Sequence, residues 1–224
     1  MSKEMTKRII TSIFLILLLA LTFHYSYILI ISLIIISIIS LIEFHELISK
    51  IFIKKTFKSN FLKLSIKATS LIYLTIFSFI IFDGIIQNDF KLTMIYLFSI
   101  CVCSDIGGLI FGKMFKGKKL TKISPKKTIS GSIGSFILSL AIVPIFYYIL
   151  GYKFNNLFDL ILLAIVVSFS CQLGDLFISY LKRKAKVKDT GDLLPGHGGI
   201  LDRIDGILFA VPVGVMLNQF LITI

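Results

Sequence analysis

The residues best suited to chemistry lie between Ser179 and Asp205, in the sequence SYLKRKAKVKDTGDLLPGHGGILDRID. This signature segment combines clustered Lys and Arg with four Asp, four Gly and one His, in a chain that is 56% hydrophobic. Pro195-Gly196 and Gly198-Gly199 flank His197, which disfavours a continuous helix and lets the backbone approach a ligand and offer peptide N–H groups. These features predict a site for a phosphate-bearing ligand.

The charged residues around this turn predict a metal ion beside the phosphate. Asp202 and Asp205 are three residues apart, so their carboxylates share one face of a helix that starts near Leu201. Mg²⁺ typically takes one or two protein carboxylates and completes its shell with water and phosphate oxygens. Arg203 adds a planar, bidentate donor. The lysine run alone is better explained by a solvated loop that orients the chain in a membrane. Such a loop does not explain Gly-His-Gly-Gly followed by Asp-Arg-Ile-Asp.

The spacing in this segment resembles the signature of the phosphatidate cytidylyltransferases, the CDP-diacylglycerol synthases. No position departs from that signature, which reads here Ser179-x-Leu181-Lys182-Arg183-x4-Lys188-Asp189-x-Gly191-x2-Leu194-Pro195-x-His197-Gly198-Gly199-Ile200-x-Asp202-Arg203-Ile204-Asp205. A match over so many fixed positions is specific, whereas a lone Gly-Gly or Asp pair is not.

Composition places the chain in a membrane. Its 224 residues have a mean hydropathy of +0.95, far above that of soluble domains. The net charge of +12 is typical of basic loops and anionic lipid contacts, and no aromatic-interleaved basic domain points to nucleic acid. The three cysteines lie in apolar runs and are interpreted as small buried hydrophobic residues.

Seven apolar runs predict an all-α, polytopic integral membrane protein with one transmembrane domain over residues 1–224. We expect the spans at about Ile9–Phe23, Tyr27–Ile42, Ser65–Phe82, Leu92–Phe111, Ser130–Leu150, Leu157–Leu181 and Ile204–Ile224. With these spans, 22 of the 24 Lys and Arg lie at the N-terminus or in the connections on the same side. The positive-inside rule then places the N-terminus and the active site on the cytoplasmic side of the cell (inner) membrane.

Acidic residues in or beside apolar spans are further candidates. Asp105 and Asp175 lie within predicted spans, where an ionised carboxylate costs about 2.5 to 3.5 kcal/mol and marks a functional residue by default. The acidic-aromatic end of the second span also resembles the family weakly, but we expect Glu43 and Glu46 to pair with nearby Lys at the interface. The small-residue pairs Gly108/Gly112 and Gly131/Ser135 permit close helix packing and a homodimer.

The family resemblance extends over about residues 100 to 210, the expected catalytic part. Ser104-Asp105 with Gly112 resembles the family's Asp-containing helix, the Ser124–Thr128 loop resembles its Ser-Pro-Lys-Lys-Thr loop, and Gly174-Asp175 also agrees. One departure is Ser130, which precedes Gly131 where the family usually has Glu before Gly. The carboxylate that the family usually has at that position is therefore replaced by a hydroxyl.

The resemblance implies that phosphatidate attacks the α-phosphorus of CTP to give CDP-diacylglycerol and pyrophosphate. It implies Mg²⁺ at Asp175, Asp202 and Asp205, a second, monovalent cation (K⁺) close by, and an organising role for Asp105. The residues expected to bind CTP or the phosphatidate headgroup are Lys126, Lys127, Lys182, Arg183, Lys188, His197, Gly198, Gly199 and Arg203.

Three other functions are weighed against this one. A related membrane enzyme, such as a CTP-dependent polyprenol kinase, shares the expected phosphate chemistry. A small ion transporter would explain Asp105 and Asp175 but not the glycine-rich loop. The CDP-alcohol phosphatidyltransferases also have Asp-x-x-Asp-Gly, but the residues after Gly206 do not continue their motif.

Overall fold

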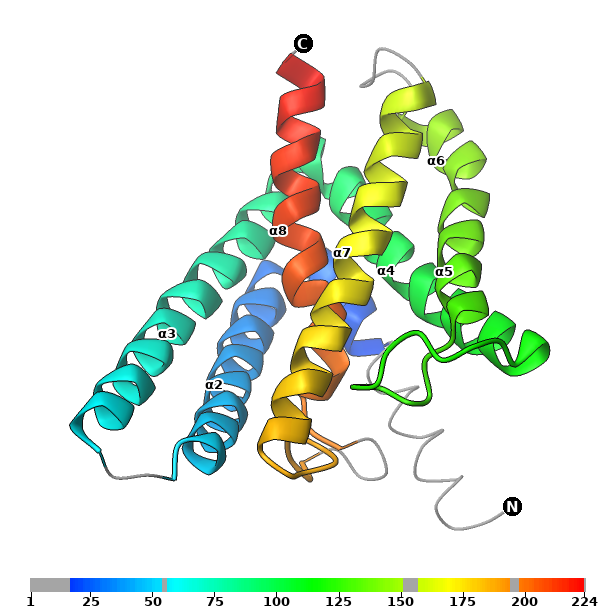
Figure 1. The fold of residues 1–224 in the computed structure, drawn as a ribbon. Helices are drawn as coiled ribbons and strands as arrows, with labels where there is room; N and C mark the ends of the chain where they lie inside the picture. Colours follow the sequence, from blue (N-terminus) through cyan, green and yellow to red (C-terminus); the bar gives the residue numbers. More distant parts are fainter. Residues whose placement is uncertain (1–16, 54–55, 151–156, 194–197, 224) are drawn as a thin grey trace. The chain divides into compact units, whose positions relative to one another are not determined.

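The computed structural model describes residues 17–53, 56–150, 157–193 and 198–223, and the elements that it assigns there are helices (Figure 1). Residues 17–24 are helical. The named helices are α2 (Ser26–Ile51), α3 (Phe57–Ile86), α4 (Asn88–Phe115), α5 (Ile129–Ala141), α6 (Val143–Leu150), α7 (Leu157–Lys184) and α8 (Leu201–Thr223). The predicted all-α class is confirmed.

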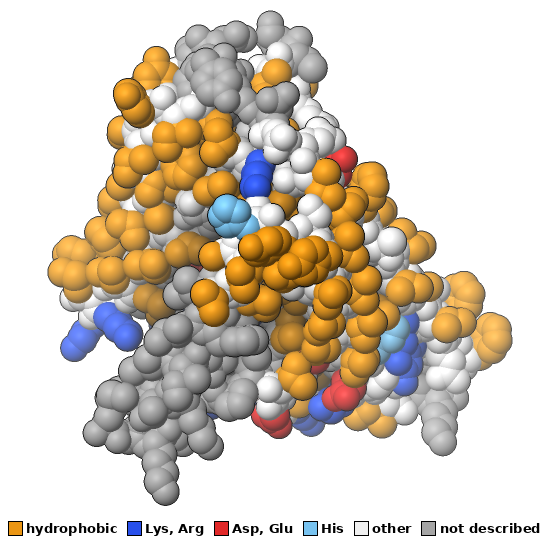
Figure 2. Space-filling model, turned by 180° about the vertical axis from the view of Figure 1, so that it is seen from behind, with side chains coloured by type: hydrophobic (Ala, Val, Ile, Leu, Met, Phe, Trp, Pro, Cys, Tyr) orange, Lys and Arg blue, Asp and Glu red, His pale blue; other side chains and the backbone are white. Residues whose placement is uncertain are grey.

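Six helical segments within the described ranges are long and apolar enough to cross a membrane, with α5 and α6 together forming one of them. They coincide with the second to seventh predicted spans, so the chain is a multi-pass membrane protein. Most of the predicted first span, Ile9–Phe23, lies outside the described residues. Hydrophobic side chains cover much of the described surface on the face shown in Figure 2, as expected where lipid is the solvent.

The helices differ from the predicted apolar runs at two places. α3 begins at Phe57, so the basic residues Lys58, Lys63 and Lys67 lie on its first turns. The fifth span is interrupted at Ile142, between α5 and α6. Pro144 explains this break, because it lacks a backbone N–H and its ring clashes with the carbonyl four residues earlier.

The chain forms two compact units, each built from separate stretches of sequence. Unit 1 comprises Met1–Ile86 and Leu181–Ile204, and unit 2 comprises Gln87–Tyr180 and Asp205–Ile224. In unit 1, α2 and α3 run side by side and antiparallel (Figure 1). They are joined by a hydrogen bond between the Ser37 and Ser78 hydroxyls at 2.6 Å.

In unit 2, small residues bring α4 and α5 into close contact. A Cβ on Gly107 would overlap the carbonyl of Gly134, and one on Gly108 would lie 3.0 Å from Ser135 Oγ. The Ser135 hydroxyl donates to the Ser104 carbonyl at 2.7 Å. The predicted Gly108/Gly112 and Gly131/Ser135 surfaces therefore pack against each other within one chain.

Candidate functional site

The signature segment begins at the end of α7 and ends in the first turns of α8. α7 stops at Lys184, and Lys186 then adopts a left-handed conformation with φ of 56°. The N–H of Val187 donates to the Lys182 carbonyl at 3.0 Å, which satisfies a carbonyl at the helix end. His197 lies outside the described residues. The predicted break in the helix around the glycine-rich turn is confirmed for the described part of the segment.

Asp202 is the centre of a hydrogen-bonded cluster in unit 1. Its Oδ1 accepts from Lys182 Nζ at 2.6 Å, and its Oδ2 accepts from the N–H of Thr190 at 2.8 Å and of Gly199 at 3.3 Å. Gly198 has φ of +79°, and a Cβ there would lie 3.1 Å from Asp202 Oδ2. Glycine at this position thus permits both the left-handed turn and the approach of the carboxylate.

Glu43 of α2 also binds the signature segment. Its carboxylate accepts from the Thr190 hydroxyl at 2.8 Å, from the Ile200 N–H at 3.0 Å and from the Leu201 N–H at 2.9 Å. Glu43 is only 6% exposed. Because the first backbone N–H groups of a helix have no partner within that helix, the Glu43 carboxylate that accepts from them stabilises the start of α8.

The expectation for Glu43 was therefore wrong, and that for Glu46 is confirmed. Glu43 binds the signature segment instead of a lysine at the membrane interface, whereas Glu46 pairs with Lys50 at 3.9 Å on the same helix. The sequence offered one signal for Glu43, an acidic residue at the end of an apolar helix. Its partners lie roughly 150 residues further along the chain, which no local pattern reveals.

In unit 2, Asp175 pairs with Lys127 of the Ser-Pro-Lys-Lys-Thr loop. The Ser179 hydroxyl donates to Asp175 Oδ1 at 3.4 Å. The loop is shaped by its own backbone, because Leu120 N–H donates to the Lys127 carbonyl at 2.8 Å and Lys127 N–H donates to the Ser124 carbonyl at 3.0 Å. A predicted carboxylate ligand and a predicted phosphate-binding lysine are thus in direct contact.

The end of this loop also starts α5. Thr128 is the N-cap, and its hydroxyl accepts from the Gly131 N–H at 3.1 Å. Ser130, which departs from the family pattern, lies with its Oγ 3.1 Å from Thr128 Oγ1 and accepts from the Gly117 N–H at 3.3 Å. Ser130 therefore ties the beginning of the basic loop to its end.

Asp205 lies at a close contact between α7 and α8 in unit 2. A Cβ on Gly174 would overlap the Asp205 carbonyl oxygen, and one on Gly206 would lie 2.5 Å from Cys171 Sγ. Asp175 is the next residue after Gly174 on α7. Asp105, the third predicted site carboxylate in unit 2, is exposed, and Cys171 Sγ lies 3.9 Å from its Oδ1.

The chemistry of these donors suits a hard divalent cation. The carboxylates of Asp175 and Asp205 come from helices in backbone contact, and carboxylate oxygens are the ligands that Mg²⁺ prefers. No group of three His, Cys, Asp or Glu positioned to hold a metal occurs within the described ranges. Mg²⁺ at Asp175, Asp202 and Asp205 accordingly stays a prediction.

The remaining predicted phosphate ligands lie on accessible surface. They are Lys126 in the Ser-Pro-Lys-Lys-Thr loop and Arg183, Lys188 and Arg203 around the signature segment, and all four are exposed. Gly199 is buried, and its N–H donates to Asp202. Substrate contacts for these residues, and for Gly198 and His197, stay predictions.

Comparisons with known proteins agree with these motifs. The model of the Cytidylyltransferase family matches residues 50–221. A phosphatidate cytidylyltransferase from Rickettsia typhi (strain ATCC VR-144 / Wilmington) is 40% identical over 142 residues, which cover 60% of this chain and 62% of the relative. One from Staphylococcus aureus (strain COL) is 42% identical over 130 residues, which cover 58% of this chain and 48% of the relative. The chain thus spans about half to two thirds of the length of the curated relatives it matches.

Proposed function

We propose a function for this chain from one premise: it belongs to the cytidylyltransferase family, whose model matches residues 50–221. The chain transfers the cytidylyl group of CTP to phosphatidate and releases pyrophosphate. Its relatives named phosphatidate cytidylyltransferase support this choice of substrates.

One observation carries the proposal: two predicted metal-binding carboxylates are each ion-paired with a predicted phosphate-binding lysine. These pairs are Lys182–Asp202 and Lys127–Asp175. A site for two polyanionic substrates needs cationic groups at the phosphates and carboxylates at a metal ion, close together. Both kinds of group are present in each pair.

The reaction requires charge neutralisation more than a protein base. A phosphate oxygen of phosphatidate forms a bond to the α-phosphorus of CTP, and the bond from that phosphorus to the pyrophosphate oxygen breaks. The attacking phosphate is already ionised at neutral pH, so the protein's task is to position both substrates and to stabilise the developing charge. Asp175, Asp202 and Asp205 would hold Mg²⁺, which would neutralise negative charge on the substrate phosphates, and a monovalent cation such as K⁺ is a second proposed ion.

The lysines and arginines have distinct parts in this scheme. Lys127 and Lys182, already oriented by carboxylates, contact the phosphates of bound CTP. Exposed cations, among them Arg183, Lys188 and Arg203, attract the phosphatidate headgroup and the CTP phosphates. Glu43 and Thr190 hold the segment that carries them.

The proposed location follows from the distribution of charge. The N-terminus and the signature segment face the cytoplasm, where CTP is available, and the chain lies in the cell (inner) membrane. A homodimer is also proposed, and it would use surfaces other than the Gly108 and Gly131 faces, because these pack on each other within one chain.

The test is pyrophosphate release by the purified chain in detergent with CTP, phosphatidate and Mg²⁺. Release that requires both phosphatidate and Mg²⁺, and that is lost in Asp202→Asn, supports the proposal. Ile76→Ala, on the exposed face of α3, is the control for general damage. If a polyprenol replaces phosphatidate as the required acceptor, or if no pyrophosphate is released, the proposal is wrong.

A further inference from the structure

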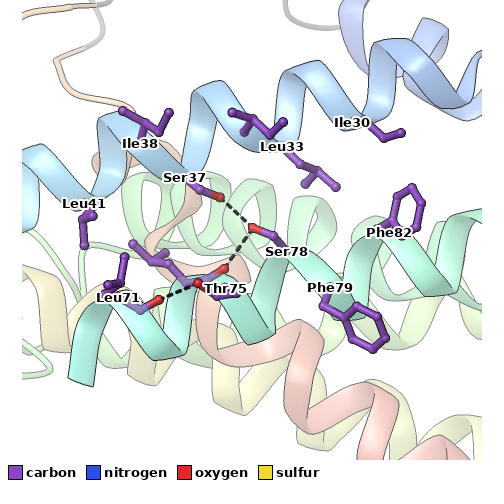
Figure 3. Close-up of a pocket in the computed structure, with 12 residues that line it drawn as sticks. Ile30, Leu33, Ser37, Ile38, Leu41, Leu71, Thr75, Ser78, Phe79 and Phe82 are labelled. Carbon is purple, nitrogen blue, oxygen red and sulfur yellow. Dashed lines mark hydrogen bonds between the residues drawn. The ribbon is translucent and has the colours of Figure 1, made fainter. Parts of the chain in front are cut away.

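An apolar groove runs between α2 and α3 within unit 1 (Figure 3). It has a volume of about 480 Å³, within the range of about 300 to 1,000 Å³ that is typical of small-ligand sites. Figure 3 shows aliphatic and aromatic side chains from both helices around it, among them Leu33, Leu41, Leu71 and Phe79. The polar groups in its wall are already partnered, because Ser37 bonds to Ser78 and Thr75 donates to the Leu71 carbonyl.

A second, polar cavity of about 760 Å³ follows along the same two helices. Leu41 lines the first cavity and Ile42 the second, and on α3 the lining passes from Leu71 to Lys67, one helical turn earlier. The apolar groove and the polar cavity are therefore consecutive along one helix pair.

The polar cavity has an excess of positive charge. Its charged lining comprises Lys50, Lys67 and Glu46, and Glu46 pairs with Lys50 at 3.9 Å. Lys67 therefore adds a positive charge that this pair does not balance. His45 is fixed beside it, with Nε2 3.3 Å from the Lys67 carbonyl and 3.2 Å from Ser70 Oγ.

The signature segment forms part of the same cavity wall. Ala185, which belongs to unit 1 as α2 and α3 do, lines the cavity and is 8% exposed. Its sequence neighbours are Lys184 and Lys186, both exposed. An anionic group in this cavity would thus lie against the segment proposed to carry the chemistry.

An apolar groove that ends in a cationic cavity matches an anionic lipid in shape and charge. Hydrocarbon chains gain little by leaving lipid for a protein groove, because lipid tails are as apolar as the groove wall. Selection among lipids must therefore come from the headgroup. Lysine ammonium groups favour a phosphate monoester, which has more negative charge than a zwitterionic headgroup.

We infer that this groove is the binding site for phosphatidate, with an acyl chain between α2 and α3 and the phosphate in the cavity lined by Lys67 and Lys50. The inference rests on the proposed function, and it adds the place where the lipid substrate binds. α2, which supplies one wall, lies almost wholly before residue 50, where the family match begins.

The first test is photolabelling of the full chain in nanodiscs with phosphatidate that has a diazirine in its acyl chain. We expect the label in peptides that contain residues 30–41 and 71–82, and we expect unlabelled phosphatidate to remove it. A phosphatidylcholine probe with the same chain should label these peptides at least fivefold less. Equal labelling by both probes, or phosphatidate label mainly in other helices, would overturn the inference.

The second test separates the groove from its surroundings with matched variants. Thr75→Trp fills the groove, whereas Ile76→Trp places the same side chain on the exposed face one residue away. Lys67→Gln removes the unbalanced charge, whereas Lys63→Gln removes a charge one turn earlier that does not line either cavity. In Lys67→Gln we expect KM for phosphatidate to rise about tenfold, as for the loss of one charge-assisted hydrogen bond. In Thr75→Trp we expect KM for phosphatidate to rise as well, because the indole ring occupies the space of the acyl chain. KM for CTP should be unchanged in both variants.

The two proposals fail in different ways. If the chain makes CDP-diacylglycerol but Thr75→Trp and Lys67→Gln match their controls in KM, the groove inference is wrong and the proposed function stands. If the chain makes no CDP-diacylglycerol but the phosphatidate probe labels the groove selectively, the proposed function is wrong and the lipid site stands.

Discussion

Glu43 makes the sharpest structural prediction, because a single side chain organises the segment proposed to carry the chemistry. Glu43→Ala removes the acceptor for the Thr190 hydroxyl and for the N–H groups of Ile200 and Leu201. Thr190 keeps Asp202 as a partner at 3.0 Å, and Ile200 is only partly buried. Leu201, at 2% exposure, is left with a buried N–H that water does not readily reach.

The magnitude follows from these differences in burial. A hydrogen bond to a charged group contributes about 1.5 to 3 kcal/mol, and a buried donor left without a partner costs a similar amount. If the Leu201 N–H contributes the full cost and Thr190 and Ile200 contribute a fraction each, the total is about 3 kcal/mol. This corresponds to roughly a hundredfold change in the local opening equilibrium. Glu43→Gln retains one carbonyl acceptor, so its effect should be about tenfold.

Hydrogen exchange in detergent measures this opening directly. We expect the amides of Ile200 and Leu201 to exchange about a hundredfold faster in Glu43→Ala, with no change in peptides from α4 and α5. Glu46→Ala is the matched control, because Glu46 lies three residues after Glu43 on the same helix and pairs with Lys50 at 3.9 Å. Exchange within twofold of the parent chain in Glu43→Ala, or an equal effect of Glu46→Ala, would refute the reasoning.

Three further predictions concern unit 2. Lys127→Met and Asp175→Asn should each lower the initial rate of CDP-diacylglycerol formation. The double variant should be no slower than the slower single variant, because the effects of mutations at contacting residues do not add. Independent effects that multiply in the double variant would contradict a functional pair. Gly174→Ala should lower the thermal midpoint of unfolding by several degrees, since overpacking costs about 1 to 3 kcal/mol. Gly112→Ala should lower it less, because a Cβ there would meet a side-chain hydroxyl at 3.2 Å as its nearest neighbour. Equal midpoints in the two variants would count against the tight α7–α8 contact. Thr128→Ala should destabilise the chain by about 1 kcal/mol through loss of the α5 N-cap, as measured by denaturant unfolding, and Thr128→Ser should restore most of it; an unchanged stability in Thr128→Ala would exclude the cap.

Much of the fold follows from local pattern. Apolar runs of membrane-spanning length predicted the helices from α2 to α8, because in lipid a helix satisfies its backbone groups internally. The small residues at Gly108 and Gly131 correctly marked a close helix contact, although pattern alone did not distinguish packing within one chain from a dimer. The break at Ile142 was missed, although Pro144 was a local signal for it.

The site was predicted in its residue types and only in part in its contacts. Lys182, Asp202, Lys127 and Asp175 were all chosen from the sequence, but their pairing was not, because Lys127 and Asp175 are far apart in the chain. Glu43 was assigned the wrong partner for the same reason. Local spacing shows which side chains can do chemistry, whereas tertiary packing decides which of them meet.

The central claim is cytidylyl transfer, and the position of the label in CTP tests it most directly. Purified chain is incubated with phosphatidate and Mg²⁺ in two parallel reactions, one with CTP labelled at the α-phosphorus and one with CTP labelled at the γ-phosphorus. We predict label in the lipid product only from the α-labelled CTP, and label in pyrophosphate from the γ-labelled CTP. Lipid labelled from the γ-phosphorus would show a kinase and contradict the account, as would the absence of lipid label from both.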